Sequence, residues 1–269
     1  MATITITNTS MISVASFVLA CGAYVILRDS RRSDVMCDLV SRISPRSRVR
    51  RGDLKSALDK TRCDTLPPSI VHSFFSVCCV CCAFALEGTL PDDDDVPYFL
   101  WESVLAHVAL SVSLGYFVMD VIVVCRTRIS GAVVIAHHLV CAATMASALV
   151  TGYGHFHICW LLLTEITTPF VDVRWLLDKT GKKDSPLYFY NGVALTATWV
   201  LARVLLFPPY FAFIFRTWEE TDGGVCTVLR SMFVVVPTFL FALNLNWFWS
   251  VSRGMYKLVV IKKASSNAT

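Results

Sequence analysis

The sequence predicts an all-α integral membrane protein, a bundle of about seven transmembrane helices with a luminal N-terminus and a cytoplasmic C-terminus. Three observations support this prediction. The chain of 269 residues is 55% hydrophobic, with a mean hydropathy of +0.59. Apolar stretches close to the roughly 20 residues needed to cross a bilayer recur along it. The loops between them alternate between basic and acidic composition. This composition excludes a water-soluble fold.

Seven stretches are long and apolar enough to be membrane spans. They cover residues 11–27, 71–86, 99–125, 131–150, 157–177, 190–215 and 231–251. Little chain is left for a soluble domain. We therefore divide the sequence into an N-terminal anchor helix with a basic loop (1–68), a membrane domain (69–257) and a tail (258–269). The first span has its positive charges behind it, which is typical of an uncleaved anchor rather than a signal peptide.

The basic loops set the expected orientation, because Lys and Arg gather on the cytoplasmic side. They crowd residues 28–62, follow the third and fifth spans, and recur in the tail, whereas acidic residues occupy 92–95 and 219–222. Arg216 and Arg230 flank the last acidic group and make that loop the least clear. Cytoplasmic loops facing anionic lipids account for the net charge of +4, so no nucleic-acid partner is expected.

The basic loop also contains regularly spaced apolar residues, which predict an amphipathic helix at the membrane surface. These are Val35, Met36, Leu39, Val40 and Ile43.

The eleven cysteines are scattered, and the densest group, 78–82, lies in the middle of a span. This pattern favours small apolar packing residues, and neither a metal site nor a cofactor is predicted.

Ionisable side chains inside the spans indicate where a site should lie, because they are costly at that depth. His137 and His138 lie six or seven residues inside the fourth span, about 10 Å deep at about 1.5 Å per residue. Asp172 lies at a similar depth on the fifth span, and a short turn joins the two. We expect a histidine to meet Asp172. A carboxylate partner makes imidazole a competent base, so these three residues are the predicted catalytic group.

Further polar residues are expected to line a chamber around this group, open towards the cytoplasmic leaflet. Glu165, Thr168 and Asp172 are spaced to share one helix face. Arg203 lies half way through the sixth span, so we predict that it pairs with Glu165 in a structural role. The prolines in the fifth and sixth spans are expected to bend the walls. The predicted chamber residues are Tyr116, Asp120, Glu165, Thr168, Arg203 and Asn246.

Two alternatives accompany this interpretation. The polar residues can act only as contacts between helices. The small residues at 141–147 either permit close helix packing or leave room for an acyl chain. The remaining histidines are expected at the interface or in packing; they are His72, His107, His155 and His157.

Four blocks of sequence resemble the TLC-domain family, which contains ceramide synthases, the translocating-chain-associating membrane protein and lipid-homeostasis proteins. The blocks are GYFVMD at 115–120, AHH at 136–138, TEITTPFVDVRW at 164–175, and NG, R and PPY within 191–210. The segment LNWFWSVSRGMYK from Leu245 is similar to the closing helix of the family. The third block most resembles the TLC domain-containing protein 4 subgroup.

The resemblance implies a multi-pass protein of the endoplasmic reticulum membrane that acts in lipid homeostasis and binds or modifies a membrane lipid in the chamber. Ceramide synthases carry a histidine pair, followed by a helix with two aspartates, and transfer an acyl group from acyl-CoA to a sphingoid amine. His137 and His138 match the first feature, but the paired aspartates are absent. An acyl-CoA-dependent lipid N-acyltransferase is therefore the alternative, and a non-catalytic membrane scaffold the second alternative.

Overall fold

The computed structural model describes residues 2–44, 48–86, 98–219 and 227–266, with side chains described from residue 9 to residue 260 within those ranges. The predicted acidic residues at 92–95 and 220–222, and the basic side chains at 262 and 263, lie outside the described part of the chain.

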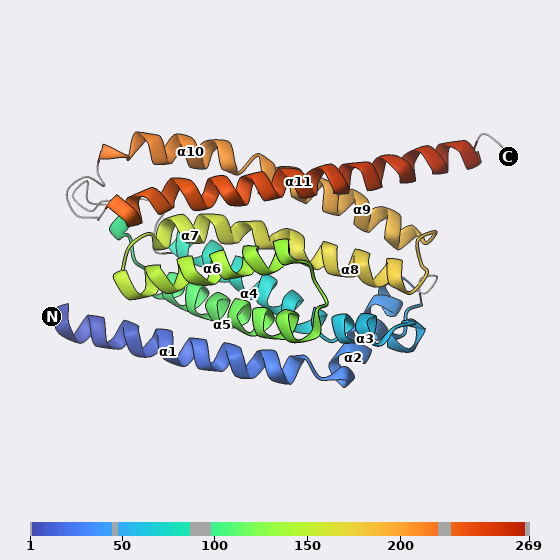
Figure 1. Ribbon diagram of the computed structural model, residues 1–269, viewed down its shortest axis with the longest axis horizontal. Coiled ribbons are helices and arrows are strands. Elements are labelled where there is room, and N and C mark those ends of the chain that lie inside the picture. The colour runs from blue at the N-terminus through green and yellow to red at the C-terminus, as the bar shows by residue number, and fades with distance from the viewer. Residues whose placement is uncertain (1, 45–47, 87–97, 220–226, 267–269) are drawn as a thin grey trace.

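Seven helical stretches among the described residues are long and apolar enough to cross a membrane. They run over Thr9–Leu27, Ala57–Leu86, Val104–Thr127, Ala132–Thr151, His155–Lys179, Pro186–Arg216 and Thr227–Val260. Each overlaps one predicted span, which confirms the all-α membrane bundle. The helices run along the long axis of the molecule, with the two termini at opposite ends (Figure 1). The side of the membrane on which each end lies stays a prediction.

Four of these spans contain one long helix each: α1 (Ala2–Leu27), α5 (Val104–Thr127), α6 (Ala132–Thr151) and α11 (Thr227–Ser266). The other three are composite. The second joins α3 (Ala57–Cys63) to α4 (Leu66–Leu86). The fifth consists of α7 (His155–Leu162), the 3-10 turn η4 (Leu163–Thr167) and α8 (Thr168–Lys179). The sixth consists of α9 (Pro186–Trp199), the π turn η5 (Val200–Val204) and α10 (Phe207–Arg216).

Proline explains where the fifth and sixth spans depart from regular α-helix. Pro169 stands in the first turn of α8, and Pro208 with Pro209 in the first turn of α10. A proline ring cannot donate a backbone hydrogen bond and crowds the preceding turn. The helix therefore tightens to a 3-10 turn before Pro169 and widens to a π turn before Pro208. These are the irregular walls that the sequence predicted.

The basic segment after α1 folds into α2 (Ser30–Ile43), as its apolar spacing predicted. One face packs inward through Cys37 and Val40, which are almost fully buried. Val35, Leu39 and Ile43 form a separate, exposed apolar stripe on the same helix. The amphipathic helix is thus confirmed, while its contact with the membrane surface stays a prediction.

Helix α5 lies at the centre of the bundle, where α1, α4 and α6 pack against it. Gly115 permits the close approach of α1, because a Cβ atom there would lie 2.8 Å from the Cβ of Ala20 and 3.0 Å from the carbonyl oxygen of Phe17. Ala106 and Ala109 on the same helix have no exposed surface. Small residues thus let α5 serve as the wall against which the polar interior is built.

Candidate functional site

A cavity of about 500 Å³ lies between α3, α4, α5, α6, α8, α9 and α11. Eight of the nine residues predicted from the sequence line this one cavity. They are Tyr116, Asp120, His137, His138, Glu165, Thr168, Asp172 and Arg203. The four predicted helices that carry them therefore do converge, and the roles of the residues stay predictions.

The ninth residue, Asn246, is a wrong prediction for the chamber. Its side chain is exposed on the outer face of α11, whereas Asn244 is 4% exposed and points into the bundle. Two residues along an α-helix are about 200° apart around its axis, so these two asparagines face opposite directions. Hydropathy fixes the extent of a span but leaves its rotation open, and this produced the error.

His138 has a carboxylate partner, but that partner is Asp120 rather than the expected Asp172. Its Nδ1 lies 2.9 Å from Oδ2 of Asp120, and the hydroxyl of Tyr24 donates to Oδ1 at 2.8 Å. Helix α6 packs extensively against α5, whereas it has few contacts with the fifth span, and most of these are with α7, directly after their shared turn. The turn therefore joins two helices that separate before the level of the histidines. Tyr24, contributed by α1, was not predicted.

Arg203 forms a closed network at the base of the cavity. Its Nη2 lies 3.7 Å from Oε1 of Glu165, which confirms the predicted pair. Its Nε donates to the hydroxyl of Thr167 at 2.6 Å, and its Nη1 to the side-chain carbonyl of Asn244 at 3.1 Å. Thr168 donates to the other oxygen of Glu165 at 2.8 Å. The irregular turns η4 and η5 and helix α11 are thereby linked through one guanidinium group.

Two other polar groups face the cavity, one with an oxygen that has no partner and one with only weak contacts to a thiol. The Asp172 side chain is buried, and its Oδ2 has no hydrogen-bond partner among the described residues. The ring of His137 stands edge-on to Trp247 and Phe117, with centroids 5.5 and 6.5 Å away. The thiol of Cys141 lies 3.9 Å from Nδ1 of His137, at the outer limit of a sulfur contact. A ligand in the cavity would find both groups available.

Two arginines line the cavity near its outer end. Arg62 donates from Nη1 to the hydroxyl of Ser130 at 2.9 Å, and Arg174 stacks over the ring of Tyr188 at 4.2 Å. The Nε of Arg62 and the Nη1 of Arg174 are buried without a hydrogen-bond partner in the described structure. Sequence reasoning passed over Arg62 because it precedes the predicted span. The mouth thus carries two arginines together with Asp178, whose carboxylate pairs with Lys183.

Two small cavities of about 40 and 30 Å³ continue from the base of the large one. The first shares Phe117, His137, Glu165 and Arg203 with it, and the second shares Thr144, Ile158, Leu161 and Val236 with the first. This narrow path runs between α6, α7 and α11, away from the mouth. Cys141, Thr144 and Ser147 line it on α6, which is where the sequence indicated either close packing or room for an acyl chain.

The TLC domain family matches residues 68–253. The chain belongs to the TLC-domain family. Among similar proteins, TLC domain-containing protein 4-A of Xenopus laevis is 27% identical over 158 residues, covering 57% of this chain and 61% of that protein. TLC domain-containing protein 4-B of Danio rerio is 26% identical over 173 residues (61% and 66%), and human TLC domain-containing protein 4 is 26% identical over 161 residues (58% and 60%). Each match spans less than two thirds of the relative.

These comparisons confirm the TLC-domain resemblance and its subgroup. This TLC-domain protein is a multi-pass membrane protein, in agreement with its seven apolar helices. Among the described residues, one group of side chains has the geometry to hold a metal ion, and it lies outside the cavity, at the other end of the bundle.

Proposed function

We propose that this TLC-domain protein acts in lipid homeostasis in the endoplasmic reticulum membrane by binding a lipid with an anionic head group in the 500 Å³ cavity. The proposed orientation keeps the cavity mouth on the cytoplasmic side. The observation that carries the proposal is the order of chemistry along the cavity: two arginines at the mouth, polar groups with few or weak partners in the middle, and a narrow apolar path beyond.

The order of these parts matches an amphipathic ligand. Arg62 and Arg174 offer the donors that phosphate or carboxylate head groups require. His137 and Asp172 can bond to the polar linkage that follows a head group. The path past Cys141 is lined mainly by apolar side chains, and its cavities of about 40 and 30 Å³ have room for the end of a hydrocarbon chain rather than its full length. A purely structural scaffold would account for the Arg203 network, but gives no reason for buried arginine and aspartate atoms without partners.

Lipid analysis of the purified full chain tests this proposal. Wild-type protein in nanodiscs of defined lipid composition should retain a specific lipid through exchange, detected by mass spectrometry of the intact complex. A double variant, R62Q with R174Q, should lose that lipid because it removes both arginine charges at the mouth. N246A, which changes an outward-facing side chain, is the matched control. Equal lipid retention by the double variant and the control would contradict binding in the cavity.

An acyltransferase is the second candidate, favoured by the contact between His138 and Asp120. Asp120 holds Nδ1, which leaves Nε2 to take a proton from the amine or hydroxyl of an acceptor lipid. The acceptor then attacks the thioester carbonyl of acyl-CoA, an amide or ester bond forms, and the thiolate of CoA leaves and takes up the proton.

Purified protein supplied with acyl-CoA and sphinganine tests this second function. Product formation should vanish in H138A, because the proposed base is then missing. Absence of product with every acyl chain length would remove this candidate and leave lipid binding intact.

A further inference from the structure

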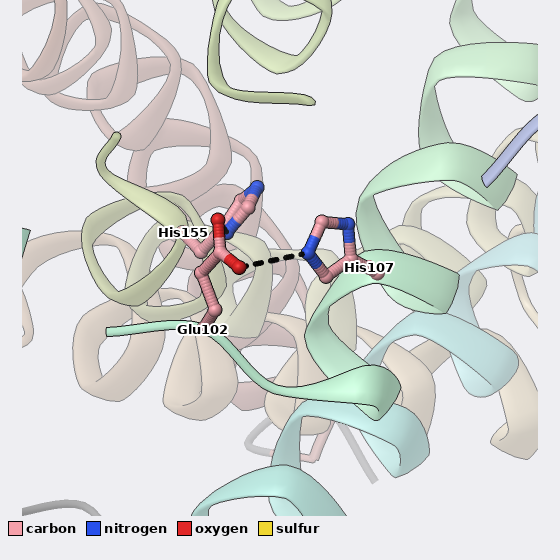
Figure 2. Close-up of side chains that lie close together, drawn as sticks. All are labelled: Glu102, His107 and His155. Carbon is pink, nitrogen blue, oxygen red and sulfur yellow. Dashed lines mark ion pairs between the residues drawn. The ribbon is translucent and has the colours of Figure 1, made fainter. Parts of the chain in front are cut away.

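A compact group of three metal-ligating side chains lies at the end of the bundle opposite the cavity mouth. Glu102 precedes α5, His107 is in the first turn of α5, and His155 begins α7. Nε2 of His107 lies 3.6 Å from one carboxylate oxygen of Glu102, and Nδ1 of His155 lies 3.9 Å from the other. Figure 2 shows both rings turned towards the carboxylate. One ligand atom from each residue lies within 4.8 Å of the other two.

The ring nitrogens that face this group make no hydrogen bond of good geometry, although His155 also interacts with the backbone of Ala148. His107 is 6% exposed and His155 is 0% exposed. Nε2 of His107 and both nitrogens of His155 are buried without a hydrogen-bond partner in the described part of the chain. Two buried imidazoles with open nitrogens are costly unless something binds them.

Ser13 on α1 fixes the orientation of one of these rings. Its hydroxyl lies 3.3 Å from Nδ1 of His107, so the remaining nitrogen, Nε2, is directed at Glu102. Histidines that bind metals commonly use one nitrogen for the ion and engage the other with a polar neighbour, which sets the tautomer. The contact with Ser13 therefore prepares His107 as a ligand through Nε2.

We propose that Glu102, His107 and His155 bind a zinc ion, with water as the fourth ligand. Two histidines and one glutamate are a ligand set that zinc uses with an open fourth position. Ligand atoms around tetrahedral zinc are about 3.3 Å apart, as follows from bonds of about 2.0–2.1 Å. The separations of 3.6 and 3.9 Å involve different oxygens of Glu102, and the three ligand atoms lie within 4.8 Å of one another, so the side chains must rotate inward to close around an ion. Imidazole ligands disfavour calcium and magnesium, which prefer oxygen.

The backbone around the group supports a built site. Gly152 and Gly154 both have positive φ, at 75° and 84°, in the turn that joins α6 to α7. A Cβ atom on Gly152 would lie 2.8 Å from Oε1 of Glu102, so this glycine leaves room for the carboxylate. The backbone N–H of Gly154 donates to the carbonyl of Phe99 at 2.8 Å, which draws the segment before Glu102 towards His155. A bound ion would tie this segment, α5 and α7 together.

The rival interpretation is an ion pair in which Glu102 is shared by protonated histidines. It requires positive charge on rings that are almost fully buried, and the side chain of Glu102 is 45% exposed, so water weakens the attraction. Metal binding needs no positive charge on either ring. The two interpretations therefore predict different responses to zinc. Only metal binding predicts that zinc is retained and raises the melting temperature.

Metal analysis of the full chain tests the proposal, using purified protein from which any histidine tag has been cleaved. After treatment with a chelator, loading with Zn²⁺ and removal of free ions, wild-type protein should retain about one zinc per chain by mass spectrometry of the metal. Zinc should also raise its melting temperature, because an ion bound to the folded state stabilises it. Loading with Co²⁺ should give visible absorption bands from a site of low coordination number.

Three variants and one matched control decide the outcome. H107A and H155A should each lose zinc retention and the thermal shift. E102Q removes an acid that is partly exposed and leaves the fold intact, and it should weaken zinc binding at least tenfold. H157Q, which alters another buried histidine on α7, should bind zinc like the wild type. No zinc on wild-type protein, or retention by E102Q equal to that of the wild type, would overturn the proposal. A melting temperature that responds to pH but not to zinc would favour the ion pair.

Discussion

The Arg203 network and the His137–Asp172 region lie in the same cavity, yet they use their polar atoms differently. Each guanidinium nitrogen of Arg203 has a partner, in Glu165, Thr167 or Asn244. Asp172 keeps an oxygen without a partner, and His137 faces aromatic rings and a distant thiol. The first group is complete without a ligand, whereas the second is not.

This difference separates two uses of buried polarity in a membrane protein. A complete network holds helices in place, and its loss should be felt as instability. An incomplete group adds little to stability and gains its partners when something enters the cavity. Stability measurements on single variants can therefore distinguish the two groups, even before a ligand is identified.

The largest effect is expected at Arg203. In R203M, Glu165 is left buried without its cation, and removal of one partner of a buried pair costs about 3–5 kcal/mol. The free energy of unfolding in detergent micelles should fall accordingly. The double variant R203M with E165L, which removes both charges, should recover most of the loss. A loss below about 1 kcal/mol in R203M would break the distinction between the groups.

A smaller effect is expected at Asn244, with Asn246 as the matched control. N244A leaves Nη1 of Arg203 without an acceptor, which should cost about 1.5–3 kcal/mol because the donor is charged. N246A alters an exposed side chain on the same helix and should change stability by less than about 0.5 kcal/mol. Equal melting temperatures for the two variants would contradict the rotation of α11 described above.

Asp120 should show an intermediate effect, because it contacts His138 and Tyr24 but also lines the cavity. D120A should destabilise the protein by about 1–2 kcal/mol, the range of polar contacts between membrane helices. Y24F provides the comparison, since it removes only the hydroxyl contact from α1. D120A loses the contacts with both His138 and Tyr24, whereas Y24F loses only the second. Equal stability of the two variants would therefore show that the contact with His138 adds no stability.

The smallest effect on stability is expected at Asp172. D172N keeps the shape of the side chain and removes a charge that no described hydrogen bond to Oδ2 supports, so stability should change by less than about 1 kcal/mol. Lipid retention in nanodiscs should nevertheless fall. A strongly destabilised D172N would place Asp172 with the structural network instead.

The number and the extent of the spans could be predicted from hydropathy, because each span must be apolar over the thickness of a bilayer. Polar residues inside the spans identified most of the cavity lining for the same reason. Helix rotation is set by packing, which is why the sequence indicated Asn246 although Asn244 is the asparagine that faces the bundle. The sequence also does not show that α6 has few contacts with the fifth span. For this reason the partner of His138 is Asp120 on α5 and not Asp172.

The group of Glu102, His107 and His155 could not be recognised from sequence spacing. His107 and His155 are separated by an entire helix hairpin, and no short motif connects them to each other. What brings them together is the pair of glycines in the turn before α7 and the pairing of Phe99 with Gly154. Tertiary contacts of this kind appear only when the turn conformation is known.

The π turn of the sixth span affects how the residues on either side of it are rotated about the helix axis. It holds one residue more than a regular turn, and Arg203 lies within it. Deletion of the exposed Leu201 would therefore restore a regular turn and leave the helix beyond it in nearly the same orientation. A deletion in the regular part of α9 has no such bulge to absorb it, so it would rotate the following residues by about 100° and move Arg203 away from Glu165. The inserted residue thus lets Arg203 face Glu165 while Phe207 and Tyr210, further along the same span, stay buried.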